Sequence, residues 1–166
     1  MVSAVSLDDH CTVLTPIERN VLNTYRDRLV GFIRANDAGF ASAKPSIDAQ
    51  GSAAATATSC DAAVIPVRGA YEDVVATNLS LKSALLTFAM NLGERCKTIS
   101  KADDSTLMQA WVQYSNDITK HYSASIRAKY VLHNVAAEQR AQSLACSDSR
   151  PTIDAALKLA AVILQQ

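Results

Sequence analysis

Glycine, proline and aromatic residues are scarce in this chain of 166 residues. It contains five Gly, four Pro and one Trp, and aromatic side chains make up 5% of the sequence. Strands are enriched in aromatic residues and their turns in Gly and Pro, whereas Ala-rich, Gly-poor chains favour helices. Apolar residues account for 49% of the chain. The composition therefore predicts an all-α protein, and the length suits a single helical-bundle domain over residues 1–166.

An excess of charge of one sign is also missing. Sixteen basic residues balance sixteen acidic ones, which argues against a protein that mainly binds nucleic acid, because phosphate backbones require a basic surface. A neutral chain lacks the repulsion that keeps copies apart, so it is compatible with a homo-oligomer. No apolar run reaches the ~20 residues that cross a bilayer, and we expect no membrane-spanning segment.

Motifs of catalysis and metal binding are absent as well. The sequence contains no Gly-x-Ser-x-Gly elbow, phosphate-cradling Gly loop, His-Glu-x-x-His pair or Cys-x-x-Cys pair. Asp117 and His121 are four residues apart on a predicted helix, but no third metal ligand accompanies them, and an ion pair explains their spacing. We expect no enzymatic activity, no cofactor and no metal site.

Apolar residues at helical spacing are what the sequence does contain. The capping box Thr15-Pro16-Ile17-Glu18 starts such a pattern and predicts a helix over residues 16–37. The remaining helices are predicted over 52–65 and 67–99 with a break or kink at Pro66, over 104–146, and over 151–165.

Three other segments have weaker patterns. Residues 38–51 contain two Gly and one Pro and are interpreted as a surface connection. Ser52–Ile65 is rich in Ala, which favours a helix, but the sequence does not decide whether this segment is ordered. The residues that include Asp8, Asp9 and His10 are predicted to be a loose N-terminal segment. No internal repeat is evident.

Residues 52–99 and 104–147 predict a long antiparallel hairpin, because they meet at the polar turn 100–103. A helix over 104–146 would be about 60 Å long at the standard rise. We therefore expect an elongated bundle of three to four helices built on this hairpin.

The four cysteines are placed so that such a hairpin would pair them. Folding back brings Cys60 near Cys146, and an antiparallel first helix brings Cys11 near Cys96. Four separate buried thiols in a cytoplasmic protein are the alternative, since spacing alone does not fix connectivity. We favour two disulfides and hence an oxidising compartment, either extracellular or at the cell surface.

Two observations bear on this compartment. The first fourteen residues hold no secretory hydrophobic region, so an extracellular location requires that a signal peptide has been removed. Asn78-Leu79-Ser80 matches the N-glycosylation pattern, which makes Asn78 a candidate glycosylation site. Because it lies within a predicted helix, it is weak support for secretion.

The large rings gather on the predicted helix 104–146. Trp111 and Tyr122 are predicted to be core residues, whereas two other tyrosines are predicted to be partly exposed. Exposed Tyr side chains are common interface anchors, and nearby basic residues would rim them. The candidate interface is therefore Tyr114, Lys120, Arg127 and Tyr130, although a solvated helix face explains these residues equally well.

Three functions are compatible with these features. The leading hypothesis is a non-enzymatic, secreted or surface-exposed bundle that mediates macromolecular interaction as a receptor, coat or adhesin, because long helices offer area. The alternative is a carrier of a fatty acid or sterol in the bundle core, where small residues leave room for lipid binding. A third is a structural subunit of a virion or filament.

Overall fold

The computed structural model describes residues 2–141 and 145–165, and every regular element within these ranges is a helix. The all-α prediction is confirmed. The helices are α1 (Val2–Cys11), α2 (Pro16–Asn36), α3 (Phe40–Ala57), α4 (Cys60–Cys96), α5 (Lys101–His121), α6 (Ala124–Ala141) and α7 (Ser149–Leu164), with the short 3₁₀ helix η1 (Cys146–Asp148) before α7. None of the described helices is long and apolar enough to cross a membrane.

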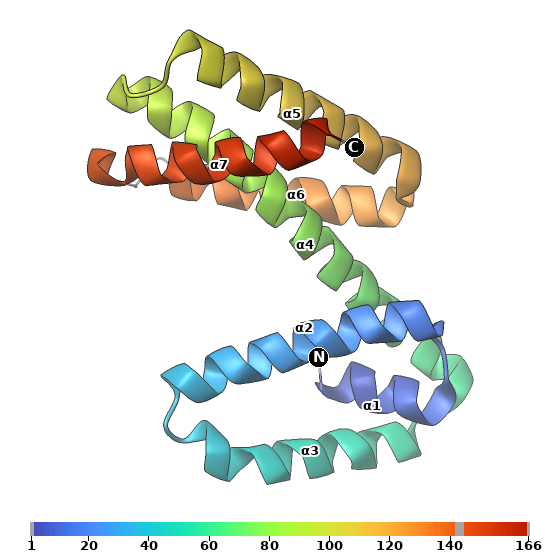
Figure 1. Cartoon of the computed structure of the whole chain (residues 1–166). Coiled ribbons are helices and arrows are strands. Elements are labelled where there is room, and N and C mark those ends of the chain that lie inside the picture. Colours follow the sequence, from blue (N-terminus) through green and yellow to red (C-terminus); the bar gives the residue numbers. More distant parts are fainter. Residues whose placement is uncertain (1, 142–144, 166) are drawn as a thin grey trace. The chain divides into compact units, whose positions relative to one another are not determined.

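The helices pack into two compact units, whose boundary in the sequence falls within α4 (Figure 1). Unit 1 is Met1–Val75 and contains α1, α2, α3 and the first part of α4. Unit 2 is Ala76–Gln166 and contains the rest of α4 with α5, α6, η1 and α7. This division was not expected from the length of the chain, which suggested one domain. The predicted elongated shape concerns both units together and stays a prediction.

The two units repeat one arrangement of four helices. In each, the first helix ends at a cysteine, and the next residue has a positive φ of 54° at Thr12 and 56° at Lys97. Three residues further on, Thr15 caps α2 and Ser100 caps α5, each by accepting a hydrogen bond from the amide three residues later. Both capped helices have 21 residues. The expectation of no internal repeat is therefore wrong.

Buried positions follow the same register, with an offset of about 85 residues. Leu22 in α2 corresponds to Leu107 in α5, and these side chains are 1% and 0% exposed. Val67 in α4 corresponds to Ile153 in α7, and both are fully buried. Because a helix that keeps the same inward positions packs in the same way, the units share a core pattern as well as an order of elements.

The joint between the first and second helix is built differently in the two units. Asp8 in α1 corresponds to Gly93 in α4, and both are buried. A Cβ at Gly93 would lie 2.7 Å from the Cβ of Ile99, so only glycine lets Ile99 pack this closely. In unit 1 the corresponding joint is made by a hydrogen bond from the Leu14 amide to Asp8.

Each unit contains one disulfide at the same place. Cys11 bonds to Cys60 and Cys96 bonds to Cys146, with sequence separations of 49 and 50. The prediction that all four cysteines form disulfides agrees with the structure, but the predicted pairs Cys60–Cys146 and Cys11–Cys96 are wrong. Cys60 begins α4 and Cys96 ends it, so opposite ends of this 37-residue helix serve different units.

The predicted break at Pro66 and the predicted single helix over 104–146 are also wrong, while the alternative of a kink at Pro66 stays a prediction. α4 continues through Pro66, because full burial of Ala63 and Val67 on either side offsets the hydrogen bond that Pro cannot make. The segment 104–146 forms two helices instead of one. Ser123 Oγ accepts a hydrogen bond from the Ile126 amide, which caps a new helix after α5 has ended. The long antiparallel hairpin is therefore not confirmed.

The segments with weak patterns are helical as well. α3 occupies most of 38–51, which was predicted as a surface connection, and continues through Pro45. The segment that includes Asp8 to His10, predicted to be loose, forms α1. This helix lies between α2 and α3 and packs on both (Figure 1). Ser52–Ile65 is helical apart from the short break between α3 and α4.

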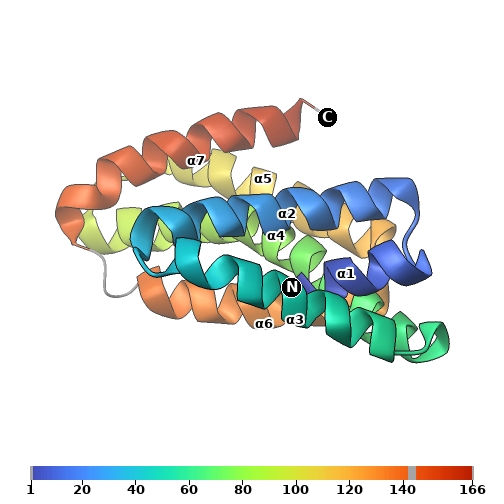
Figure 2. The same cartoon turned by 90° about the horizontal axis from the view of Figure 1, so that it is seen from below.

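Small residues bring the helices of unit 2 close together. α7 packs along α5, as both views show (Figure 1, Figure 2). Ala156 and Ala160 in α7 and Ala110 in α5 are fully buried. Ala permits a close approach at no cost in side-chain entropy, so the Ala-rich composition serves helix packing.

We expect the loss of either disulfide to destabilise the protein by about 2–4 kcal/mol, because each closes a loop of about 50 residues in the unfolded chain. The variants are Cys11→Ala with Cys60→Ala, and Cys96→Ala with Cys146→Ala, measured by urea unfolding. Peptide mapping of the unreduced protein checks the pairing. A peptide that links Cys60 to Cys146 would contradict the structure.

Candidate functional site

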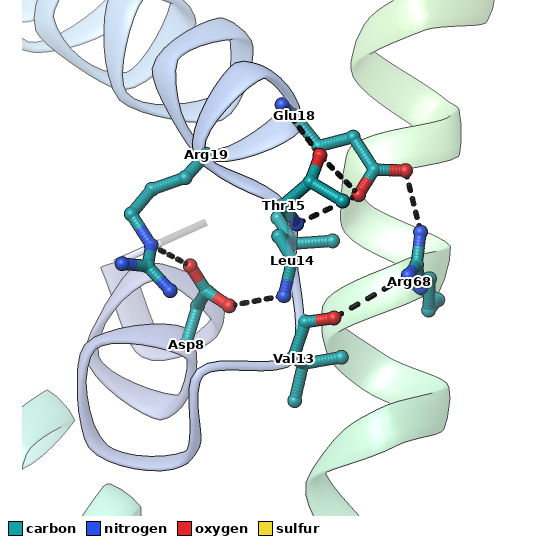
Figure 3. A network of polar contacts seen from close by, with 7 residues as sticks. All are labelled: Asp8, Val13, Leu14, Thr15, Glu18, Arg19 and Arg68. Carbon is teal, nitrogen blue, oxygen red and sulfur yellow. Dashed lines mark hydrogen bonds and ion pairs between the residues drawn. The ribbon is translucent and has the colours of Figure 1, made fainter.

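A cluster of charged side chains joins α1, α2 and α4 in unit 1 (Figure 3). Asp8 is 1% exposed, and its carboxylate accepts hydrogen bonds from the Leu14 amide at 2.7 Å and from Arg19 Nε. The hydrogen bond to Asp8 raises the pKa of the Arg19 guanidinium. Because the two donors come from the α1–α2 loop and from α2, this carboxylate fixes the angle at which the chain turns.

Glu18 and Arg68 extend the cluster to α4. Glu18 Oε2 accepts hydrogen bonds from the amide and the hydroxyl of Thr15, both at 2.9 Å, and Oε1 accepts one from Arg68. The backbone hydrogen bond from Thr15 is the largest cause that lowers the pKa of Glu18, and Arg68 lowers it further. Arg68 also donates to the Val13 carbonyl at 3.3 Å. Each charged group is engaged within unit 1, which is the pattern of a structural network.

His10 lies near the disulfide of unit 1. One ring nitrogen and the sulfurs of Cys11 and Cys60 lie within 4.8 Å of one another, which is a spacing that could suit a metal ion. The two sulfurs are bonded to each other, however, and zinc requires thiolates. This group is therefore a disulfide with a neighbouring imidazole.

Two of the four predicted interface residues are buried. The hydroxyl of Tyr114, a residue that is 9% exposed, donates to the Leu79 carbonyl at 3.2 Å, and burial raises the pKa of this phenol. Tyr130 is 8% exposed and donates to Ser83 Oγ at 2.8 Å. Their predicted exposure is wrong because both rings face α4, where each hydroxyl finds a partner and can be buried.

The other predicted site residues lie at the surface. Lys120 is exposed, and Arg127 donates a hydrogen bond to the Thr119 carbonyl at 2.8 Å near the end of α5. Asn78 is exposed on α4, while Ser80 of the same triplet is buried and donates to the Ala76 carbonyl. Trp111, which was predicted to be core, is only half-buried.

A groove between α5 and α7 is the larger of the two grooves that we describe on unit 2. It has a volume of about 520 Å³ and is lined by Met108, Gln109, Val112, Gln113, Asn116, Asp117, Lys120 and Leu164. Met108, Val112 and Leu164 are 47%, 45% and 38% exposed, which is high for apolar side chains on packed helices. We call it the α5–α7 groove. It includes Lys120 from the predicted interface but neither buried tyrosine.

The signal for this groove was present in the sequence. Met108 and Val112 are four residues apart, and each directly follows another apolar residue at the same spacing, Leu107 and Trp111. A second apolar row beside the first widens the stripe beyond what one neighbouring helix covers.

The chain matches no protein-family model, no curated protein and no solved structure. Function is therefore inferred from geometry and chemistry alone.

We expect Asp8→Ala to lower the free energy of unfolding by about 1–3 kcal/mol, because the Leu14 amide would remain buried without its acceptor. Asp9→Ala is the matched control, since Asp9 is exposed on the same helix. Equal effects of the two substitutions in urea unfolding would show that the buried carboxylate contributes nothing specific.

The lowered pKa of Glu18 predicts a pH-dependent contribution to stability. The contribution is fully present above the ordinary value of 4.5 and is lost as the pH falls through the lower pKa of the folded state. Glu18→Gln should therefore be less stable than the natural protein at pH 7, and the difference should shrink below about pH 4.5. Urea unfolding at a series of pH values measures it. A difference that does not change with pH would contradict this assignment.

Proposed function

We propose that this protein is a non-enzymatic, extracellular or cell-surface module that binds a protein partner in the α5–α7 groove. The observation that carries the proposal is the row of exposed apolar side chains, Met108, Val112 and Leu164, along two packed helices. Exposed apolar side chains that line one groove are typical of interaction sites, whereas single ones are common on any surface.

The shape and rim of the groove support an amphipathic helix as the bound segment. A groove between two packed helices accepts the apolar face of a third helix, as helix-in-groove complexes do. Gln109 and Asn116 supply amide groups to the lining, whereas Gln113 already donates to the Ile163 carbonyl in α7. Asp117 and Lys120 supply one charge of each sign. Met108, Val112 and Leu164 therefore provide the apolar contact, and the polar side chains provide orientation.

The disulfides support an oxidising compartment. Both units carry one, at equivalent positions. Stable disulfides are rare in the reducing cytosol and common in secreted proteins, which is why we place the protein outside the cell or on its surface.

A carrier function is less well supported. It was suggested by the many small residues, which would leave space between helices for a fatty acid or sterol. In the structure, Ala89 in α4 and Ala110 in α5 are fully buried by neighbouring helices. The space beside these small residues is occupied by protein, so they favour close packing over ligand storage.

A photo-crosslinking amino acid placed at Val112 tests the proposed function. We expect it to link to a segment of a partner that mass spectrometry identifies as an amphipathic helix. The same amino acid at Val131, which is 55% exposed on α6 and outside the groove, is the matched control. Val112→Glu should weaken binding of the identified segment by about tenfold or more, and Val131→Glu should not, because a charge would be buried only in the groove.

The other outcomes of this experiment contradict the proposal. Links from position 112 to a second copy of the chain would indicate a self-assembling structural subunit. Equal labelling from both positions would show that the groove has no special role.

A further inference from the structure

A second groove in unit 2 lies between the last turns of α4 and the first turns of α5. It has a volume of about 370 Å³ and is lined by Thr87, Met90, Asn91, Glu94, Asp104, Met108 and Trp111. Two carboxylates, two thioethers and an indole share this space, and none of the described residues that line it is a Lys or Arg. We call it the acidic-aromatic groove. Its chemistry differs from that of the α5–α7 groove, although Met108 lines both.

We propose that the acidic-aromatic groove binds a small organic cation of the quaternary ammonium class. Glu94 is exposed and Asp104 is half-buried, so both carboxylates are accessible to a ligand. Carboxylates without a lysine or arginine in the same lining attract a positive charge and repel an anion. Trp is the aromatic side chain that binds cations best, and quaternary ammonium groups are recognised through contact with aromatic rings.

The position of Trp111 favours contact through its ring. The side chain lines the groove, but its Nε1 is shielded from solvent and has no hydrogen-bond partner within the described ranges. The part of the indole that a ligand meets is therefore ring carbon. Methyl groups of a quaternary ammonium can pack on such a surface and on the thioethers of Met90 and Met108 while the charge stays near the carboxylates.

A metal ion fits this groove less well. Calcium takes six to eight oxygen ligands, and magnesium needs octahedral geometry. No third His, Cys, Asp or Glu among the residues that the structure describes completes a ligand set with Glu94 and Asp104. The thioethers and the indole cannot replace the water that a small ion would lose. An organic cation loses little hydration and gains apolar contact.

The repeat provides an internal comparison. Unit 1 has a groove of about 390 Å³ at the equivalent place, and four of its lining residues, Val5, Ser6, Asp9 and Arg26, correspond to Met90, Asn91, Glu94 and Trp111. The carboxylate is retained, but Arg26 stands where unit 2 has Trp111, and Lys44 lines the groove as well. Arg26 pairs with Asp27, and Lys44 pairs with Asp48. The described lining of unit 1 therefore has a net charge of one carboxylate, Asp9, and no Trp. The described lining of unit 2 has two carboxylates and Trp111, so it suits a cation better.

The volume of the groove limits the size of the ligand. Pockets for drug-sized ligands run from about 300 to 1,000 Å³, and this one is near the lower end. It can accept a trimethylammonium group from a free small molecule or from the headgroup of a phosphocholine lipid, but not the lipid chains.

Fluorescence titration tests the proposal directly, because Trp111 is the only tryptophan of the chain. Tetramethylammonium and choline should change the emission in a saturable manner. The uncharged carbon analogue of choline, 3,3-dimethyl-1-butanol, has the same shape and should bind about tenfold more weakly, since it lacks the charge. Equal binding of choline and this analogue would overturn the proposal, and so would the absence of a saturable change.

Variants locate the ligand. Glu94→Gln with Asp104→Asn should weaken choline binding by about tenfold, because both carboxylates lie near the surface and each contributes a modest attraction. Asp9→Asn is the matched control in unit 1 and should change nothing. Trp111→Leu, measured by calorimetry, should also weaken binding. Circular dichroism shows whether each variant is folded. An equal effect of Asp9→Asn, or no effect of the unit 2 variants, would show that the groove is not the site.

Two further experiments distinguish a lipid headgroup from a free small molecule, and the cation site from the protein-binding groove. If phosphatidylcholine vesicles shift the emission and phosphatidylglycerol vesicles do not, the groove binds a lipid headgroup. If only soluble choline shifts the emission, the ligand is a free small molecule. Val112→Glu should leave choline binding unchanged. Failure of the protein-partner proposal would therefore not remove the cation site, and the reverse also holds.

Discussion

In each unit, one disulfide joins the end of the first helix to the start of the last. Cys11–Cys60 and Cys96–Cys146 bring together residues about 50 positions apart, and the two intervening helices must fit within the loop that each bond closes. The first helix of unit 1 has only ten residues, too few to be stable alone in water. Its position is fixed by the disulfide at its last residue, by Asp8 one turn earlier, and by packing on α2 and α3.

The repeat explains why the four helices of a unit are arranged as they are. Conserved features between the units are the cysteines, the left-handed residue after the first of them, the cap of the second helix and the buried Leu22 and Leu107. Other positions differ, such as buried Asp8 against Gly93 and exposed Leu29 against buried Tyr114. The same scaffold therefore carries two grooves at equivalent places, with Arg26 in one and Trp111 in the other.

Local signals in the sequence predicted individual helices well. The capping box at Thr15 located α2 to within one residue at each end, because cap and apolar face agree there. Proline and glycine led to wrong predictions of a loop over 38–51 and of a break at Pro66. Pro66 and Pro45 lie inside helices. At Pro66, burial of Ala63 and Val67 outweighs one missing hydrogen bond, whereas the residues around Pro45 are not buried. Ser123 was overlooked as a cap because apolar spacing continues past it, from Ile118 to Ile126.

Features that depend on contacts between distant residues could not be predicted from the sequence. The pairing of cysteines depends on which helices share a unit. The predicted pairs assumed one uninterrupted helix over 104–146, and the break between α5 and α6 makes that assumption wrong. The repeat is not visible in the sequence, because the residue types at most corresponding positions of the two units differ. The burial of Tyr114 and Tyr130 depends on acceptors in α4 that no spacing rule reveals.

α4 belongs to both units, and this has a thermodynamic consequence. Its first part is the last helix of unit 1 and its last part is the first helix of unit 2, and both belong to one helix of 37 residues. Unfolding that starts at either end of α4 must therefore pass through the middle of the helix, where packing in unit 1 on the N-terminal side and in unit 2 on the C-terminal side stabilises it. Neighbouring modules in solenoid proteins gain cooperativity through their interfaces, whereas α4 joins the two units through the chain itself. We expect that opening of one half of α4 makes opening of the other half more probable.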